Sequence, residues 1–264
     1  MLNKDGGPQP NVSNDGYYIP TKKEQRYFKK LEVLVVVPHA DYKCDAKFTK
    51  CLVNMVAYSW NYGLKIYQMG ATERTVVDWA RNCIGDFARK MTNPFTGNKY
   101  THLLWLDDDH VFTPDVALVL ARHKKQMCTG VYWARLKPHH PTIYVKDTMD
   151  DDKYRHFPLT VIPNALFKCD AAGFGCMWMD RGVLDIVPEP WFTIDFRCGE
   201  DVGFCVHAKE NGIGIWCDGC CHIGHIGVPG IVTHKTYLEY QKQHPEEFGE
   251  MVKVKLGGEI IGGK

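Results

Sequence analysis

The chain has 264 residues, of which 45% are hydrophobic and 24% charged, as in one large globular domain. Lys and Arg (32) nearly balance Asp and Glu (31), so the net charge of +1 gives no general attraction to nucleic acid or anionic membrane. No apolar run reaches the roughly 18 residues that span a bilayer, and the polar N-terminal sequence is not a signal peptide. With 11 cysteines and no export signal, we expect a cytoplasmic protein that is not bound to a membrane.

The first half of the chain alternates predicted strands and helices. Continuous apolar runs predict four buried strands, at 31–38, 64–69, 102–106 and 127–133. Apolar residues at steps of three and four predict helices over 48–60 and 76–91. Thr113, followed by Pro114, predicts the N-cap of a third helix. This order implies a parallel sheet built by right-handed crossovers.

Beyond residue 133 the pattern changes. Short apolar segments with few helices between them indicate a small antiparallel or mixed extension, at 142–146, 159–162, 165–170 and 174–179. A helix is predicted over 199–212, a last strand at 214–218 and a final helix over 234–248. We expect one α/β domain at 26–230, with a flexible arm at 1–25 before it and a helical extension at 231–264 after it.

Three consecutive aspartates, Asp107, Asp108 and Asp109, follow the strand predicted at 102–106. Ligands of open parallel sheets bind beyond the carboxyl ends of the strands. Side chains of an extended segment alternate in direction, so Asp107 and Asp109 would face one point while Asp108 faces away. Two converging carboxylates suit a divalent cation that keeps positions open for phosphate oxygens. The alternative is a solvated turn.

The segment LLWLDDDHVFTPDVALVL resembles the Asp-x-Asp segment of GT-A-fold, family-2-like glycosyltransferases. Five other segments resemble parts of that fold in the same order: VVVPHAD, VDWARNCIGDFA, GVYWARLKPHHP, CDAAGFGCMWMDRGVL and GEDVGFCVHAKENGIGIWCDGCCHIGHIG. The resemblance covers roughly residues 31 to 227. It implies a Rossmann-like GT-A fold with a mixed, mostly parallel central sheet, flanking helices and a small antiparallel extension.

The resemblance also implies ligand-binding roles. The metal, Mn²⁺ or Mg²⁺, would be held by Asp107, Asp109 and His225, and His222 is the rival of His225. The donor, expected to be a UDP-sugar, would contact Pro38, His39, Asp41, Arg81, Asn82, Asp107 and Asp108. The metal would neutralise the diphosphate as it leaves.

On the acceptor side, the resemblance points to Asp201, with Glu200 beside it, at the start of the helix predicted over 199–212. In an inverting enzyme Asp201 would be the general base, and in a retaining enzyme the same position would orient the acceptor. Acidic residues are also common in the first turn of any helix. The wall of the acceptor site would include Gly173, Phe174, Gly175 and Trp191.

The sequence therefore predicts a metal-dependent glycosyltransferase that acts on a hydroxyl of a glycan, a protein or a hydroxymethylated DNA base, and it leaves the oligomeric state open. One alternative is a zinc-stabilised nucleic-acid-binding module. Its candidate ligands are Cys217, Cys220, Cys221, His222 and His225, and its basic patch is Lys22, Lys23, Arg26, Lys29 and Lys30. Another alternative is a nucleotidyltransferase, although PHADYKCDAKF lacks the glycines of its usual phosphate loop.

Overall fold

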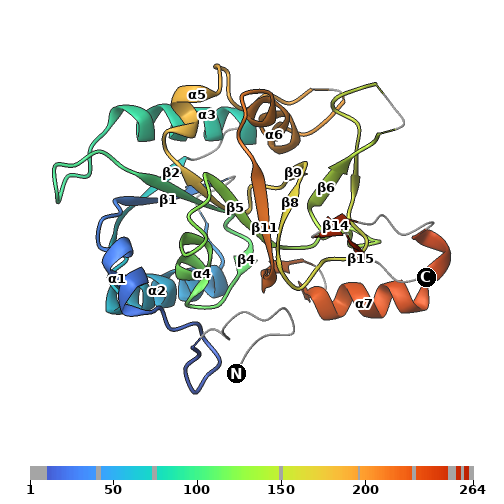
Figure 1. The fold of residues 1–264 in the computed structure, drawn as a ribbon, viewed down its shortest axis with the longest axis horizontal. Coiled ribbons are helices and arrows are strands. Elements are labelled where there is room, and N and C mark those ends of the chain that lie inside the picture. Colours follow the sequence, from blue (N-terminus) through green and yellow to red (C-terminus); the bar gives the residue numbers. More distant parts are fainter. Residues whose placement is uncertain are drawn as a thin grey trace.

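The computed structural model describes residues 11–39, 43–72, 76–148, 151–195, 197–227, 230–248, 254–256 and 259–261. At its centre is a seven-stranded sheet of order β2-β1-β3-β10-β5-β11-β8 (Figure 1). The strands are β1 (Val33–Pro38), β2 (Ile66–Thr72), β3 (His102–Leu106), β5 (Met127–Val131), β8 (Leu166–Cys169), β10 (Cys176–Asp180) and β11 (Ile215–His222). β10 and the edge strand β8 run antiparallel to their neighbours, and the other pairs are parallel.

Helices cover both faces of this sheet. They are α1 (Lys22–Phe28), α2 (Ala46–Asn61), α3 (Val77–Lys90), α4 (Val116–Ala121), α5 (Val183–Ile186), α6 (Glu200–Glu210) and α7 (His234–Gln243), with the 3-10 turn η1 (Pro245–Glu247). Figure 1 shows α1, α2 and α4 on one side of the sheet and α3, α5 and α6 on the other. Alternate residues of a strand serve the two sides: Leu104 packs with the α1–α2–α4 cluster, and Trp105 with the α3–α5–α6 cluster. Both faces are buried, which explains the continuous apolar runs.

Three small antiparallel sheets complete the fold. β4 (His110–Val111), β12 (Gly224–Ile226) and β13 (Ile231–Val232) form one in the order β13-β12-β4; β6 (Ile143–Lys146), β7 (His156–Pro158) and β9 (Ala171–Ala172) form another in the order β7-β6-β9; β14 (Val254–Leu256) pairs with β15 (Glu259–Ile261). The predicted fold class, a mostly parallel central sheet flanked by helices with small antiparallel additions, is confirmed.

Several predicted elements differ in detail. The segment at 174–179 becomes β10, which lies inside the central sheet between β3 and β5 rather than in the extension. Residues 159–162 form no strand. The final helix stops at Gln243, because Pro245 disfavours helical backbone in the residue before it.

The helix after the aspartates begins later than the sequence predicts. The N-cap of α4 is Asp115, not Thr113, and its side chain makes no capping bond. Its carboxylate instead accepts the Tyr18 N–H at 2.7 Å. A long-range contact to the N-terminal segment has therefore replaced local capping. No helix among the described residues combines the length and apolarity needed to cross a membrane.

The close packing around β11 can be tested by a substitution at Gly219, which lies within that strand. A Cβ at this position would overlap the carbonyl oxygen of Pro163 and lie 3.2 Å from Ile162. Gly219→Ala should therefore lower the free energy of unfolding in urea by about 1–3 kcal/mol. Gly214→Ala is the control, because its Cβ would meet nothing closer than 3.4 Å. Equal stability of the two variants would contradict the close packing.

Candidate active site

The three aspartates form a turn between β3 and β4. The Asp107 carbonyl oxygen accepts the His110 N–H at 3.3 Å, and Asp108 and Asp109 are turn residues. The segment is not extended, so the alternation expected from the sequence does not apply. The three carboxylates point to three different partners instead.

Each aspartate contacts a group on a different part of the fold. Asp107 Oδ1 accepts from Arg81 Nη2 at 3.1 Å. Asp108 Oδ2 lies 2.8 Å from His39 Nδ1, which follows β1, the parallel neighbour of β3. Asp109 belongs to a third group, described next. Pro38 ends β1 beside His39, and Asp41 lies outside the described residues.

Asp109, His110 and His225 form a compact cluster. One potential ligand atom of each lies within 4.8 Å of the others. The cluster depends on strand register, because antiparallel pairing of β4 with β12 sets His225 directly opposite His110, with ring centroids 4.6 Å apart. Among the described residues, only His244, Glu246 and Glu247 form another group of this kind, and Asp107 belongs to neither.

Backbone carbonyls fix the orientation of both imidazoles. Nδ1 of His225 lies 2.8 Å from the Trp133 carbonyl oxygen, and Nδ1 of His110 lies 2.7 Å from that of Gly175. A carbonyl only accepts, so each Nδ1 carries the proton and each Nε2 is left as the potential ligand. His225 Nε2 is 3.2 Å from Asp109 Oδ2. His110 Nε2 is buried and has no hydrogen-bond partner in the described part of the chain.

The ionisation states also suit a cation. Burial alone would raise the pKa of Asp109, but the His225 contact and the positive charge of Arg135 outweigh it and lower that pKa. Burial lowers the pKa of His110, which keeps its imidazole neutral. A carboxylate and two imidazoles are a donor set that proteins use for divalent metals. Sequence reasoning missed His110; its place directly after Asp109 was the available signal.

A buried arginine joins the aspartate turn to α6. Arg81 comes from α3, and its side chain is 4% exposed. Nη2 binds Asp107 and Nη1 binds Glu200, the first residue of α6. Burial alone would lower the pKa of Arg81, but the carboxylates of Asp107 and Glu200 outweigh it and raise that pKa. The guanidinium is thus a fixed positive charge.

Glu200 and Asp201 form a partly buried carboxylate pair at the N-terminus of α6. Burial raises the pKa of both, and the charge of Arg81 works against that shift. Asp201 Oδ1 accepts the Val202 N–H of its own helix at 2.7 Å. A carboxylate with a raised pKa is better suited to take a proton near neutral pH.

Two of the predicted acceptor-side residues are glycines that allow close packing. A Cβ on Gly173 would overlap the Tyr132 hydroxyl, and a Cβ on Gly175 would overlap the His110 ring. The Tyr132 hydroxyl also accepts the Gly175 N–H at 3.2 Å. Gly175 therefore lies against the Asp109–His110–His225 cluster.

The remaining predicted site residues, Asn82, Trp191 and Phe174, stabilise the local structure. Asn82 donates to the Phe192 carbonyl and accepts the N–H groups of Trp191 and Phe192 at 3.0 and 3.1 Å, so it fastens that segment to α3. Trp191 is buried, and Phe174 is buried against Phe192. The structure therefore brings Arg81 to the carboxylates, while Asn82 is occupied by backbone groups.

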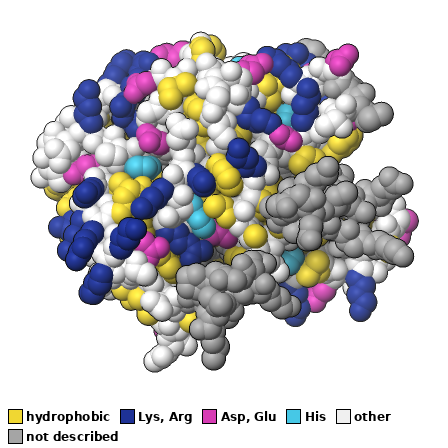
Figure 2. All heavy atoms as spheres, in the orientation of Figure 1, with side chains coloured by type: hydrophobic (Ala, Val, Ile, Leu, Met, Phe, Trp, Pro, Cys, Tyr) yellow, Lys and Arg dark blue, Asp and Glu magenta, His cyan; other side chains and the backbone are white. Residues whose placement is uncertain are grey.

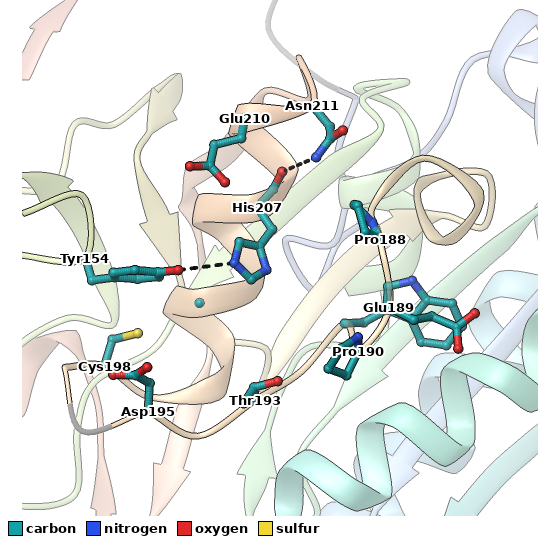
Figure 3. Close-up of a pocket in the computed structure, with 12 residues that line it drawn as sticks. Tyr154, Pro188, Glu189, Pro190, Thr193, Asp195, Cys198, His207, Glu210 and Asn211 are labelled. Carbon is teal, nitrogen blue, oxygen red and sulfur yellow. Dashed lines mark hydrogen bonds between the residues drawn. The ribbon is translucent and has the colours of Figure 1, made fainter.

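A hollow of about 280 Å³ lies between α6 and the segment 188–198 (Figure 3). Gly203, His207 and Glu210 line it from one side of α6, and Figure 3 shows the His207 ring directed toward the Tyr154 hydroxyl, 3.2 Å from Nε2. Of the predicted site residues only Trp191 lines this hollow. A shallower hollow of about 630 Å³ lies between α3 and the segment 189–193.

The cysteine-rich segment does not form a zinc site within the described residues. All 11 cysteines are free, and none belongs to a candidate metal group. His222 Nε2 lies 2.9 Å from the Gly219 carbonyl oxygen, and its ring lies against Trp133 and His234. His225, not His222, lies beside Asp109.

The fold and the site thus define a mixed α/β protein with a candidate cation cluster after β3 and a carboxylate pair at the start of α6. No protein-family model matches the chain, and no curated protein matches its sequence. Among solved structures, A197 from STIV is similar, with a TM-score of 0.50 and 17% identity over 74% of this chain and 86% of that chain. GalNAc-T7, crystallised with UDP, GalNAc and Mn²⁺, has a TM-score of 0.49 and 11% identity over 81% of this chain and 48% of that chain. The likeness to A197 concerns the fold alone, and that to GalNAc-T7 is too weak to support an argument.

Removing Arg81 tests the charge cluster. Arg81→Met should lower the free energy of unfolding at pH 7 by about 3–5 kcal/mol, because it leaves buried carboxylates without a counter-charge. The raised pKa values of Glu200 and Asp201 mean that the folded state favours their protonated forms. Their contribution to stability is therefore full at acid pH and is lost as pH rises through the raised values. The deficit of the variant should shrink between pH 7 and pH 5 in urea unfolding.

Lys90→Met is the control for this prediction. Lys90 lies on the same helix, is exposed, and pairs with Asp86 at 2.7 Å one turn earlier. Exposed pairs of this kind contribute less than about 1 kcal/mol. A loss in Arg81→Met that is equally small, or that does not change with pH, would show that the arginine is not buried among charged carboxylates.

Proposed function

We propose that this protein is a metal-dependent glycosyltransferase of the GT-A type, which transfers a sugar from a nucleoside-diphosphate donor, expected to be a UDP-sugar, to an acceptor hydroxyl. One observation carries the proposal. The aspartate turn after β3 contacts a candidate metal cluster through Asp109 and the α6 carboxylates through Asp107 and Arg81. Candidate groups that would activate the donor therefore lie on one side of this short turn, and candidate groups that would remove the acceptor proton lie on the other.

On the donor side, Asp109 and His225 would hold the cation. A divalent cation there would neutralise the diphosphate as the glycosidic bond breaks. His39 and Asp108 sit at the neighbouring carboxyl end of β1, where a nucleotide bound at this sheet edge would lie. Arg81, whose own side chain is buried, keeps the partly exposed Asp107 in place by an ion pair.

On the acceptor side, Asp201 would accept the hydroxyl proton in an inverting reaction. Its raised pKa makes it a stronger base than a solvated aspartate. Glu200 would hold the start of α6 through its contact with Arg81. The hollow along α6 begins three residues after Glu200, and we propose it as part of the acceptor path.

The acceptor class is the finer part of the proposal: a glycan, a protein or a hydroxymethylated DNA base. Lys and Arg side chains gather over the region of α1 and α2 (Figure 2), which would suit the phosphates of DNA. Screening UDP-sugars for hydrolysis and then adding each acceptor class would separate these possibilities.

Free thiols throughout the described chain accord with the cytoplasmic location proposed from the sequence.

The metal role of the aspartate turn can be tested by a matched pair of variants. Asp109→Ala should reduce Mn²⁺-dependent UDP release from a UDP-sugar by at least about 100-fold, because it removes the carboxylate that would bind the metal. Asp108→Asn should stay within about tenfold of the parent, because its amide can still meet His39. Thermal melts should show both variants folded. Unchanged turnover in Asp109→Ala would refute the proposal.

The base role of Asp201 can be tested separately. Asp201→Asn should lower kcat by about 10²–10⁴-fold with little change in affinity for the nucleotide. It should not lose stability at pH 7, because burial disfavours the charged form of this residue. Glu200→Gln is the comparison, and its kcat should stay within about tenfold of the parent, because the amide oxygen can still accept from Arg81. Full activity of folded Asp201→Asn would exclude it as the base.

A further inference from the structure

His110 is the least explained group in the cluster. Its side chain is completely buried, yet Nε2 has no hydrogen-bond partner among the described residues. An unpaired polar atom in such a place is unfavourable unless a ligand meets it. The nitrogen belongs to the one cluster in which Asp109 and His225 also offer ligand atoms within 4.8 Å.

The surroundings hold this imidazole in one orientation. The Gly175 carbonyl oxygen accepts from Nδ1, and the absence of a Cβ on Gly175 makes room for the ring. The Tyr132 ring lies 4.4 Å away between centroids. Pairing of β4 with β12 fixes the opposite His225. A backbone carbonyl on Nδ1 with a free Nε2 is the usual arrangement of a metal-binding histidine.

We propose that His110 is a third protein ligand, so that the centre consists of the Asp109 carboxylate and the two imidazoles of His110 and His225. Asp107 then stays outside the centre, in its ion pair with Arg81. This differs from the set of Asp107, Asp109 and His225 that the sequence resemblance implies. Because Asp109 and His110 are adjacent on one turn and His225 faces them from β12, the remaining coordination positions would be open to phosphate oxygens or water.

A donor set with two nitrogens predicts a choice of metal. Mg²⁺ and Ca²⁺ are hard cations that prefer oxygen ligands, whereas imidazole favours first-row transition ions and Zn²⁺. The centre should therefore bind Co²⁺ and Zn²⁺ more tightly than Mn²⁺, and all three much more tightly than Mg²⁺ or Ca²⁺. The use of this metal in catalysis rests on the proposed function, but its binding can be measured without any substrate.

The test uses the full chain, freed of metal by a chelator and then titrated with Co²⁺ while its visible absorption is followed. His110→Gln should weaken Co²⁺ binding by about 100-fold or more. His222→Gln is the matched control, since His222 also lies on a strand in this region but contacts Trp133 instead of the cluster. Its Co²⁺ affinity should stay within about threefold of the parent. A millimolar excess of Mg²⁺ should not displace Co²⁺ from the parent.

A second measurement needs no variant and therefore does not depend on folding of His110→Gln. Pulsed EPR of the parent with bound Mn²⁺, with and without ¹⁵N-histidine, counts the imidazole ligands. Two imidazole nitrogens support the proposal. One nitrogen, or Co²⁺ affinity unchanged in folded His110→Gln, overturns it while leaving a metal-dependent transferase intact. Two nitrogens in a protein that never cleaves a nucleotide-sugar would refute the proposed function and leave this inference standing.

Discussion

The ion pairs of Arg81 connect parts of the chain that are far apart in sequence. The guanidinium leaves α3, meets Asp107 after β3 and meets Glu200 at the start of α6, across 26 and 119 residues of chain. Its Cζ lies 5.6 Å from the Phe174 ring centroid and 5.9 Å from that of Phe192, so aromatic rings shield it from water. Without partners, a charge buried in this way would cost several kcal/mol. The folded state therefore requires α3, the aspartate turn and α6 to be placed together.

A second constraint is set by Gly175, which follows Phe174, one of the two aromatic residues that shield Arg81. The Gly175 carbonyl oxygen, just before β10, accepts both the Asp107 N–H at 3.1 Å and His110 Nδ1 at 2.7 Å. One backbone atom thus fixes both ends of the aspartate turn. Because β10 is antiparallel to β3, Cys176 pairs with Leu106, which carries Gly175 to the exit of that strand. The central position of β10 therefore serves the site as well as the core.

These two constraints explain which parts of the site could be predicted from sequence. Apolar runs located the main strands, since burial on both faces leaves a clear signal. The order of the motifs points to Asp109, His225, Arg81 and Glu200 as candidate site residues, and the structure places all four around the aspartate turn. The role of His110 depends on pairing between β4 and β12, strands of two and three residues, which are too short for a periodic pattern. Strand alternation failed at 107–109 because the chain turns immediately after Leu106. Likewise, the occupation of Asn82 by backbone groups depends on a segment about 110 residues away.

Considered for stability alone, the site is poorly arranged. Glu200 and Asp201 have pKa values raised by burial, and His110 Nε2 and Arg81 Nε lack partners within the described chain. A fold could relieve each of these with an apolar side chain of similar size, and buried charged networks often gain stability when replaced in that way. These groups are concentrated around one turn at the carboxyl edge of the sheet, where open α/β sheets generally bind ligands, and such local conflicts with stability are typical of functional sites. A bound cation would give His110 Nε2 a partner, whereas the cost of burying the charged form of Asp201 would be relieved by a proton. Under the proposed function, the two halves of the site would therefore hold unfavourable groups of different chemistry, one that a metal would satisfy and one that a proton from the acceptor would satisfy.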